Sequence, residues 1–493
     1  MMRGMVPSST RVIALIRKAS ASPAVYVVVS LVALYLGYAL NLWRAADYRL
    51  YTDGQCAFLE APGLLGPETL PDQLATFDRY SEGLVVGRLL ANEAGGFFSR
   101  GGFTGWFTDS LTAPEGVDPN LYAAAYQYKL YLDPPPERPL QTYDRYVSHV
   151  GGQALFVGVL DAVLPFGNGT KLRVYYHVMA ALTALAFVAI LVWFFREFGA
   201  SAAWFLTVVF SLLCYPTLYA KNLWWVIWAF YLPFVALLYF FREEERRGGV
   251  LSFRSLFLLA FGTMLTKLFF NGCEYITTTL VMAMIPACYY ALKNRWSRRR
   301  FFRSSGVLVL ASGLAILVFF VALASQYVLA GDTFMDGVRH IADRFLVRTH
   351  GGGDAIAEEL GRRNGVPLLS LLRWYATAPA VFDLRKMGID RVIAMKWMMV
   401  LYVAVSVAWA LVLHRCREAE RRTRIKALLV TVWLSALAPC SWFVVFKGHS
   451  DVHRSLASIT WYMPFMFYGM ALLGVSLEAL IQRSRRGSRA VLT

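Results

Sequence analysis

Charged residues are scarce in this chain, and their scarcity excludes an ordinary soluble protein. Asp, Glu, Lys and Arg make up 16% of the 493 residues, against roughly a quarter in a typical globular protein. The six cysteines are scattered and form no Cys-x-x-Cys pair, which excludes a disulfide framework and gives no sign of a structural zinc site. A P-loop and a dinucleotide-binding fingerprint are also absent, so no nucleotide site is expected.

Long apolar runs take the place of the missing charge. Hydrophobic residues make up 57% of the chain, and the mean hydropathy is +0.47. An apolar run of about 20 residues is long enough to cross a bilayer. The runs therefore predict an all-α polytopic membrane protein with about ten transmembrane helices, at 23–43, 172–195, 201–219, 222–241, 251–270, 274–293, 305–330, 392–414, 426–446 and 457–481.

The distribution of basic residues predicts the orientation of these helices. If the N-terminus is cytoplasmic, the short inner segments carry 25 of the 49 Lys and Arg residues, as the positive-inside rule requires. The net charge of +17 is thus explained by topology rather than by nucleic-acid binding, and we expect the basic segments 295–303 and 415–426 to contact anionic lipid. The predicted order is a cytoplasmic N-terminus (1–22), the first span (23–43), a first outer loop (44–171), spans two to seven (172–330), a second outer loop (331–391), spans eight to ten (392–481) and a basic cytoplasmic tail (482–493).

Both long outer loops contain helical patterns. The spacing of apolar residues predicts a helix over 72–95 that ends at Gly95-Gly96, and an amphipathic helix over 334–348. The apolar stretch at 152–165 is too short to span comfortably and is interpreted as an interfacial helix. Loops of this length usually carry function.

The strongest local signal follows the ninth predicted span. Lys447, His449, Asp451, His453 and Arg454 lie within eight residues at the outer boundary, where charge is costly without a partner. Lysine binds phosphate as a point charge, and imidazole can donate hydrogen bonds to it. The pattern predicts that the two cations and two histidines bind a lipid phosphate, with Asp451 in support. The alternative is an ordinary polar turn.

Two further outer turns carry polar residues. Lys267 and Glu274 stand at the two ends of one turn, either as supporting functional residues or only as a mutual ion pair. The other turn, over 215–225, contains Trp224 and Trp225, which are interpreted as membrane-interface residues.

Acidic residues after the first span are candidate catalytic bases. Asp53 is followed by Gly54, which favours a tight turn, and Asp78 lies farther along the same loop. A carboxylate held at the bilayer surface can accept the proton of an acceptor hydroxyl.

This layout resembles the type C glycosyltransferase superfamily, polytopic enzymes that use polyprenyl-phosphate sugars. The shared features are a cytoplasmic N-terminus, a long outer loop with an acidic residue near its start, a second outer loop, and basic residues near late spans. The resemblance implies that Asp53, or Asp78 as second choice, is catalytic and that Lys447 and its neighbours bind the donor phosphate. The chain lacks the Asp-Glu pair of protein mannosyltransferases and the WWDYG signature of oligosaccharyltransferases, which leaves the sugar and the acceptor open.

The resemblance further implies a polyprenyl-phosphate sugar as donor and a glycan, lipid or protein as acceptor, with no nucleic acid involved. No cofactor is required by the sequence, although the outer carboxylates are compatible with a divalent cation. A bacterial inner membrane is the expected location. The sequon Asn168-Gly169-Thr170 is also compatible with the endoplasmic reticulum.

Two other functions remain open at this point. A lipid-linked glycan polymerase or ligase of the O-antigen type would use outward Arg and His without a dedicated carboxylate. A lipid or glycan transporter would need ionisable groups near the middle of the membrane, whereas the polar residues found here cluster at the outer boundary.

Replacing Asp53 and Asp78 by alanine, one at a time, distinguishes the glycosyltransferase from the polymerase or ligase. We expect one of these substitutions to lower sugar transfer by roughly a hundredfold or more, because a positioned base contributes about that much. Transfer is measured on membranes that contain equal amounts of each variant, which controls for insertion. Activity that survives both changes favours the polymerase or ligase.

Overall fold

The computed structural model describes residues 22–45, 79–108, 119–134, 142–249, 252–350, 367–385, 388–416 and 418–491. These residues form a helical bundle, and their only strands pair as two short antiparallel two-stranded sheets. Eight described helical segments are long and apolar enough to cross a membrane, which confirms the polytopic all-α class. Five of them are single helices: Pro23–Leu40 (α2), Asn168–Phe198 (α7), Phe253–Asn271 (α11), Ile276–Lys293 (α12) and Arg298–Leu329 (α13). Two are composite: Met395–Arg415 consists of α17 (Met395–Val412) and η3 (Leu413–Arg415), and Ala419–Val445 consists of α18 (Ala419–Ser435) and α19 (Leu437–Val445). The last, Phe465–Arg483, is the first part of α22 (Phe465–Val491).

The remaining two predicted spans have a different form in the structure. The range 201–219 was expected to be one helix, but it is divided into α8 (Ala200–Leu212) and α9 (Cys214–Tyr219) at the extended residue Leu213. Pro216 explains the break, because proline lacks the N–H that would bond to the carbonyl of residue 212 and its ring clashes with that carbonyl. The predicted range 222–241 corresponds to α10 (Ile227–Arg246), whose last turn is charged. Residues 222–226 of that range form a loop before the helix.

Helix α12 lies in the middle of the bundle. It packs against α10, α13, α18 and α19, while α7 packs against α2, α8 and α10. Helix α22 lies against α8, α17 and α18. Aromatic rings fill the space between these elements: Phe210 and Phe467 stack with their centroids 4.0 Å apart, and Trp193 is fully buried.

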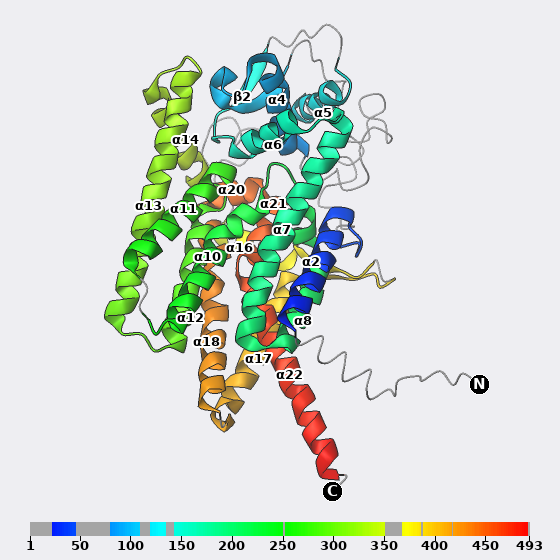
Figure 1. The fold of residues 1–493 in the computed structure, drawn as a ribbon, viewed down its shortest axis with the longest axis vertical. Helices are drawn as coiled ribbons and strands as arrows, with labels where there is room; N and C mark the ends of the chain where they lie inside the picture. The colour runs from blue at the N-terminus through cyan, green and yellow to red at the C-terminus, as the bar shows by residue number, and fades with distance from the viewer. Residues whose placement is uncertain are drawn as a thin grey trace, which may run out of the picture.

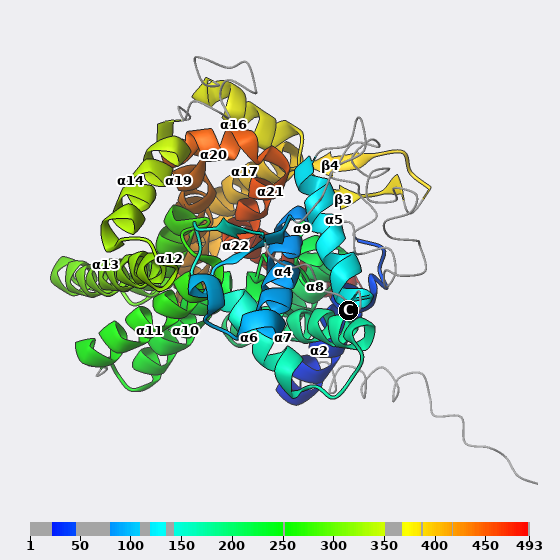
Figure 2. The same ribbon diagram turned by 90° about the horizontal axis from the view of Figure 1, so that it is seen from above.

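Most of the described residues of the two predicted outer loops gather at one end of this bundle, opposite the C-terminus (Figure 1). The first loop contributes α4 (Arg79–Gly95), η1 (Ser99–Gly102), β1 (Thr104–Phe107), α5 (Pro119–Leu132), β2 (Tyr143–Tyr146) and α6 (Gly152–Val163). The second contributes α14 (Phe334–His350), α16 (Leu368–Thr377) and β3 (Ala380–Asp383), and β3 pairs with β4 (Val392–Ala394) at the start of the predicted eighth span. We call the first set, α4 to α6, the cap. Seen from this end, α14 lies beside α20 (Lys447–Val452), away from α4 and α5 (Figure 2).

The loop helices confirm several sequence predictions. Helix α4 ends at Gly95, as expected, and Gly96 has a φ of 84°, a conformation that glycine adopts readily. The first residues of the predicted 72–95 helix, 72–78, lie outside the described part of the chain. Helix α14 covers the predicted amphipathic stretch, and α6 has 12 residues, too few to span the membrane.

Glu82 joins the cap to the bundle. This buried carboxylate accepts hydrogen bonds from the backbone N–H of Leu223 (2.8 Å), from the Tyr128 hydroxyl of α5 (3.0 Å) and from the Tyr176 hydroxyl of α7 (3.4 Å). Burying a carboxylate is costly unless its oxygens are hydrogen-bonded. The position of α4 over the bundle is therefore fixed by a polar contact as well as by apolar packing.

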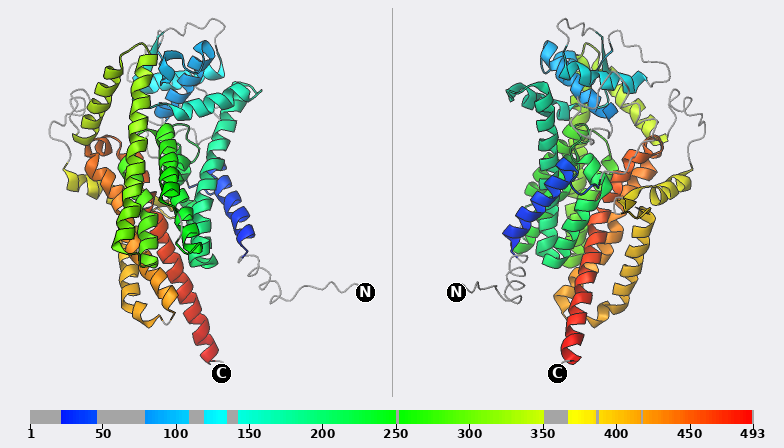
Figure 3. Two further views of the ribbon diagram at one scale, coloured as in Figure 1. Left: turned by 60° about the vertical axis from the view of Figure 1, so that its left-hand side comes forward. Right: turned by 90° about the vertical axis from the view of Figure 1, so that its right-hand side faces the viewer.

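The end of α12, the start of α13 and the C-terminal part of α22 lie at the opposite end from the cap (Figure 3). Because these segments carry the basic loops, the positive-inside rule predicts that the cap faces away from the cytoplasm. Asp343 in α14 and Arg299 in α13 are exposed, so a single cysteine introduced at either position tests this orientation.

In intact cells, a membrane-impermeant maleimide should label Asp343→Cys above the background of the unmodified chain. It should label Arg299→Cys only after the membrane is permeabilised. The reverse pattern would show that the protein has the opposite orientation.

Candidate functional site

The turn between α11 and α12 is the centre of a polar cluster below the cap. Gly272 has a φ of 52° and a ψ of −142°, and Tyr275 has a φ of 50°, so the chain reverses within a few residues. The fully buried Lys267 donates hydrogen bonds from Nζ to the backbone carbonyls of Gly272 (2.8 Å) and Glu274 (2.6 Å). The Lys267 side chain therefore holds the turn by binding the backbone carbonyls of the turn. The suggested mutual ion pair of the Lys267 and Glu274 side chains is wrong.

The carboxylate of Glu274 binds two other segments of the chain. Its Oε1 lies 2.8 Å from Nη1 of Arg348 at the end of α14, and its Oε2 accepts a hydrogen bond from Nε2 of His449 in α20 at 3.1 Å. The Glu274 side chain is 4% exposed. Burial by itself raises the pKa of this carboxyl, but Arg348 and His449 outweigh it and hold the pKa well below the usual range.

His149 is a buried member of the cluster without a hydrogen-bond partner among the described residues. Its ring packs against Trp224, with centroids 4.8 Å apart, and lies close to Gly272. Neither ring nitrogen has a hydrogen-bond partner among the described residues. Burial lowers the pKa of His149 to about 3, although Glu274 acts in the opposite direction. The imidazole is thus neutral at physiological pH.

His453 extends the cluster beyond His449. The two rings have centroids 4.5 Å apart. Burial, with a contribution from the His449 ring, lowers the pKa of His453 to about 3. We refer to Lys267, Glu274, Arg348, His149, His449 and His453 as the Glu274 cluster.

The residues predicted to bind phosphate are only partly brought together. Arg454 donates from Nε and Nη2 to Oδ1 of Asp451, at 2.9 and 2.5 Å, so that its charge is balanced within α20 and α21 (Arg454–Ala457). Lys447 is half-buried at the start of α20 and forms no hydrogen bond or ion pair with any described residue. Of the predicted set, the two histidines belong to the Glu274 cluster and Lys447 remains available for a ligand.

The interpretation of the paired tryptophans as membrane-interface residues is wrong. Trp224 and Trp225 are 4% and 5% exposed. The side chain of Asn222 accepts hydrogen bonds from both of their backbone N–H groups, and Asn271 exchanges two hydrogen bonds with the backbone of Val226. This loop is folded inward beneath the cap, where its rings pack on His149 and on Tyr275.

Asp53 and Asp78, the predicted catalytic residues, lie outside the described part of the chain. Arg348 and His149 also belong to the cluster, although neither is among the residues predicted from the sequence. Arg348 ends the predicted amphipathic helix, and its position there was the available signal. His149 gave no signal, because a single histidine in a loop has no partner that sequence can identify.

Two carboxylates of the cap, one in α4 and one in α6, are also bound by donors. Glu82 has the three bonds described above, and Oδ1 of Asp161 accepts from the hydroxyls of Tyr131 (2.7 Å) and Tyr175 (2.6 Å) and lies 3.2 Å from Nζ of Lys171. A carboxylate with its oxygens occupied by donors is a poor general base. Within the described residues, no three His, Cys, Asp or Glu side chains are placed to hold one metal ion.

Comparison with known proteins leaves the chain without a match: no family model, no curated protein and no solved structure is similar to it.

Replacing Glu274 by glutamine tests the cluster. We expect a marked loss of melting temperature in detergent, because removing one partner of a buried ion pair costs about 3–5 kcal/mol. The folded carboxyl has its pKa below the unfolded value, so its stabilisation is complete above the unfolded pKa and is lost only as the pH falls through the folded pKa. The loss in the variant should therefore be about the same at pH 7 and pH 5.5.

The matched control is Glu243→Gln, which removes a solvent-accessible carboxylate paired with Arg246 and Arg247 on α10 and should change the melting temperature much less. If the effect of Glu274→Gln disappeared at pH 5.5, the carboxyl would already be protonated there, and the ionised cluster would be ruled out.

Proposed function

We propose that the protein is an integral-membrane glycosyltransferase that moves a sugar from a polyprenyl-phosphate donor to an acceptor at the capped, extracytoplasmic end. The proposal rests on the combination of charge and apolar surface around Lys447. A cation without a partner among the described residues stands at the end of a candidate span, with the exposed apolar side chains of Val444, Val445 and Val452 close to it in the chain. A phosphate attached to a hydrocarbon chain matches this combination better than a water-soluble sugar phosphate does.

The charges of neighbouring residues favour an anion at the same place. His449 lies in the same short helix as Lys447, and Arg348 enters the Glu274 cluster from α14, which packs on α20. The positive charges of Lys267, Arg348 and Lys447 exceed the single negative charge of Glu274. Charged groups held in fixed positions, partly out of water, stabilise a developing anion more strongly than the same groups do in solvent.

The proposed reaction is a direct displacement at the anomeric carbon. The hydroxyl oxygen of the acceptor forms a bond to this carbon while the bond to the donor phosphate oxygen breaks. The hydroxyl proton passes to Asp53, with Asp78 as second choice, and the bonding electrons leave with the polyprenyl phosphate, which Lys447 stabilises. One displacement inverts the anomeric centre. No cofactor is required, and a divalent cation at the outer carboxylates is compatible with this scheme.

The occupied carboxylates near the cap support Asp53 and Asp78 as the candidate bases. Both carboxylate oxygens of Glu82 and of Glu274 are bound by donors, so neither residue is well suited to take a proton from an incoming hydroxyl. A multi-pass location in a bacterial inner membrane, with both termini cytoplasmic, belongs to the same proposal.

A second candidate is a lipid-linked glycan polymerase or ligase. The observation that favours it is the Glu274 cluster itself, in which one arginine and three histidines gather around a carboxylate. Such a site could orient a lipid pyrophosphate without a separate acidic base. Transport is less well supported, because α12 carries no charged residue between Ile276 and Lys293, and ionisable groups lie at its two ends.

Reconstitution with a radiolabelled polyprenyl-phosphate sugar and an acceptor tests the proposal. We expect label to be transferred, and Lys447→Ala to lower kcat/KM roughly 10- to 100-fold, since a hydrogen bond to a charged group contributes about 1.5–3 kcal/mol. The control is Lys396→Ala, an exposed lysine at the start of α17, which should transfer label normally. Translocation of label without transfer would show a transporter instead.

A further inference from the structure

A polar pocket lies at the end of the bundle opposite the cap. It has a volume of about 440 Å³ and is lined by Glu245 from α10, by Lys293, Asn294 and Arg295 at the end of α12, and by Ala419, Glu420, Thr423 and Arg424 at the start of α18. This volume is in the range of small-ligand sites, roughly 300–1,000 Å³. Since α12 and α18 are both candidate spans, the pocket stands at the depth of lipid headgroups.

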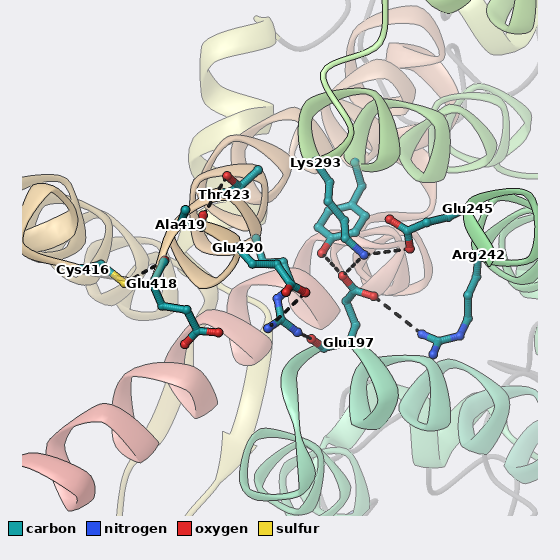
Figure 4. Close-up of polar contacts among 11 residues, drawn as sticks. Glu197, Arg242, Glu245, Lys293, Cys416, Glu418, Ala419, Glu420 and Thr423 are labelled. Atoms are coloured by element: carbon teal, nitrogen blue, oxygen red, sulfur yellow. Dashed lines mark hydrogen bonds and ion pairs between the residues drawn. The ribbon is translucent and has the colours of Figure 1, made fainter. Parts of the chain in front are cut away.

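A buried ionic network forms the base of the pocket (Figure 4). Oε1 of Glu197 lies 2.6 Å from Nζ of Lys293 and accepts a hydrogen bond from the Tyr289 hydroxyl at 2.7 Å. Lys293 also contacts Oε2 of Glu245 at 2.9 Å, and Arg424 donates to the backbone carbonyl of Glu197 at 3.0 Å. These contacts join α7, α10, α12 and α18, so the wall of the pocket is held in place before any ligand arrives.

The rim of the pocket presents separate positive and negative groups. Arg295 is exposed and forms no ion pair or hydrogen bond with any described residue. Its φ of 49° is a conformation that a residue other than glycine adopts at a cost. The side chain of Glu420, which also lines the pocket, is 74% exposed, and its only ion pair within the described residues is a long one, 3.7 Å, to Arg424.

From this arrangement we infer that the pocket binds the headgroup of a zwitterionic aminophospholipid. Its phosphate would lie against Arg295 and Arg424, and its primary ammonium against Glu420 and Glu245. The lining has three basic side chains and two carboxylates, so a purely anionic headgroup would be held by the bases but would leave the exposed carboxylate of Glu420 unpaired and facing it. A quaternary ammonium has no N–H to donate to a carboxylate, so a choline headgroup fits less well. The exposed apolar side chains of Leu292 and Phe302 lie on the adjoining helices, where acyl chains would run.

This site does not depend on the proposed glycosyltransferase activity, because it lies at the other end of α12 from the Glu274 cluster. Either proposal can therefore fail without the other.

Binding of defined lipids to the delipidated full-length protein tests the inference. Native mass spectrometry would compare phosphatidylethanolamine, phosphatidylcholine and phosphatidylglycerol of identical acyl chains. We expect the unmodified protein to retain phosphatidylethanolamine best, and Arg295→Ala to weaken its binding about tenfold, as expected for loss of one charge-assisted hydrogen bond. Arg299→Ala, a matched exposed arginine outside the pocket, should bind as the unmodified protein does.

A second variant separates recognition from general folding defects. Glu420→Gln should lower the affinity for phosphatidylethanolamine and raise that for phosphatidylglycerol, because the repelling carboxylate is removed. Glu418→Gln, which changes an exposed neighbour outside the pocket, should leave the preference unchanged.

Free phosphoethanolamine as a competitor distinguishes a soluble ligand from a lipid: competition at equal concentration would overturn the lipid assignment. Equal losses in Arg295→Ala and Arg299→Ala, or tighter binding of phosphatidylglycerol by the unmodified protein, would overturn the site.

Discussion

The ionised carboxylate of Glu274, held out of water, is the constraint on which the capped end of this protein depends. A carboxylate with 4% exposure persists only if its charge is matched and its oxygens are bonded. Arg348 and His449 meet that requirement, and Lys267 supports the turn that carries Glu274. Because these partners come from α14, α20 and α11, one buried charge fixes the relative positions of three segments that are distant in sequence.

The same logic operates at the other end of α12, where Glu197 is matched by Lys293 and Arg242. Between the two ends, α12 contains no charged residue, since hydrocarbon does not solvate charge. The membrane therefore divides the chemistry of the protein into two separate layers. The capped layer combines an available lysine with an arginine–histidine cluster, and the opposite layer combines a pocket with groups of both signs.

Sequence patterns predicted the elements whose cause is local. Hydropathy alone located the eight helices that can span, because each must present about 20 apolar residues to lipid. Helical spacing located α14 and the end of α4 at Gly95. The prediction of one continuous helix over 201–219 was wrong because the breaking effect of Pro216 was not weighed, although that signal was present in the sequence.

The polytopic class, the approximate spans and the polar residues at the membrane boundary thus follow from the sequence alone. Which of these polar residues come into contact depends on how the helices pack. The Glu274 carboxylate contacts Arg348 and His449 rather than Lys267. Trp224 and Trp225 are buried, and His149 packs against Trp224. The physical reason is that hydropathy and periodicity depend on neighbours along the chain, whereas the cost of a buried charge is met by whichever partner the packing of helices brings within reach.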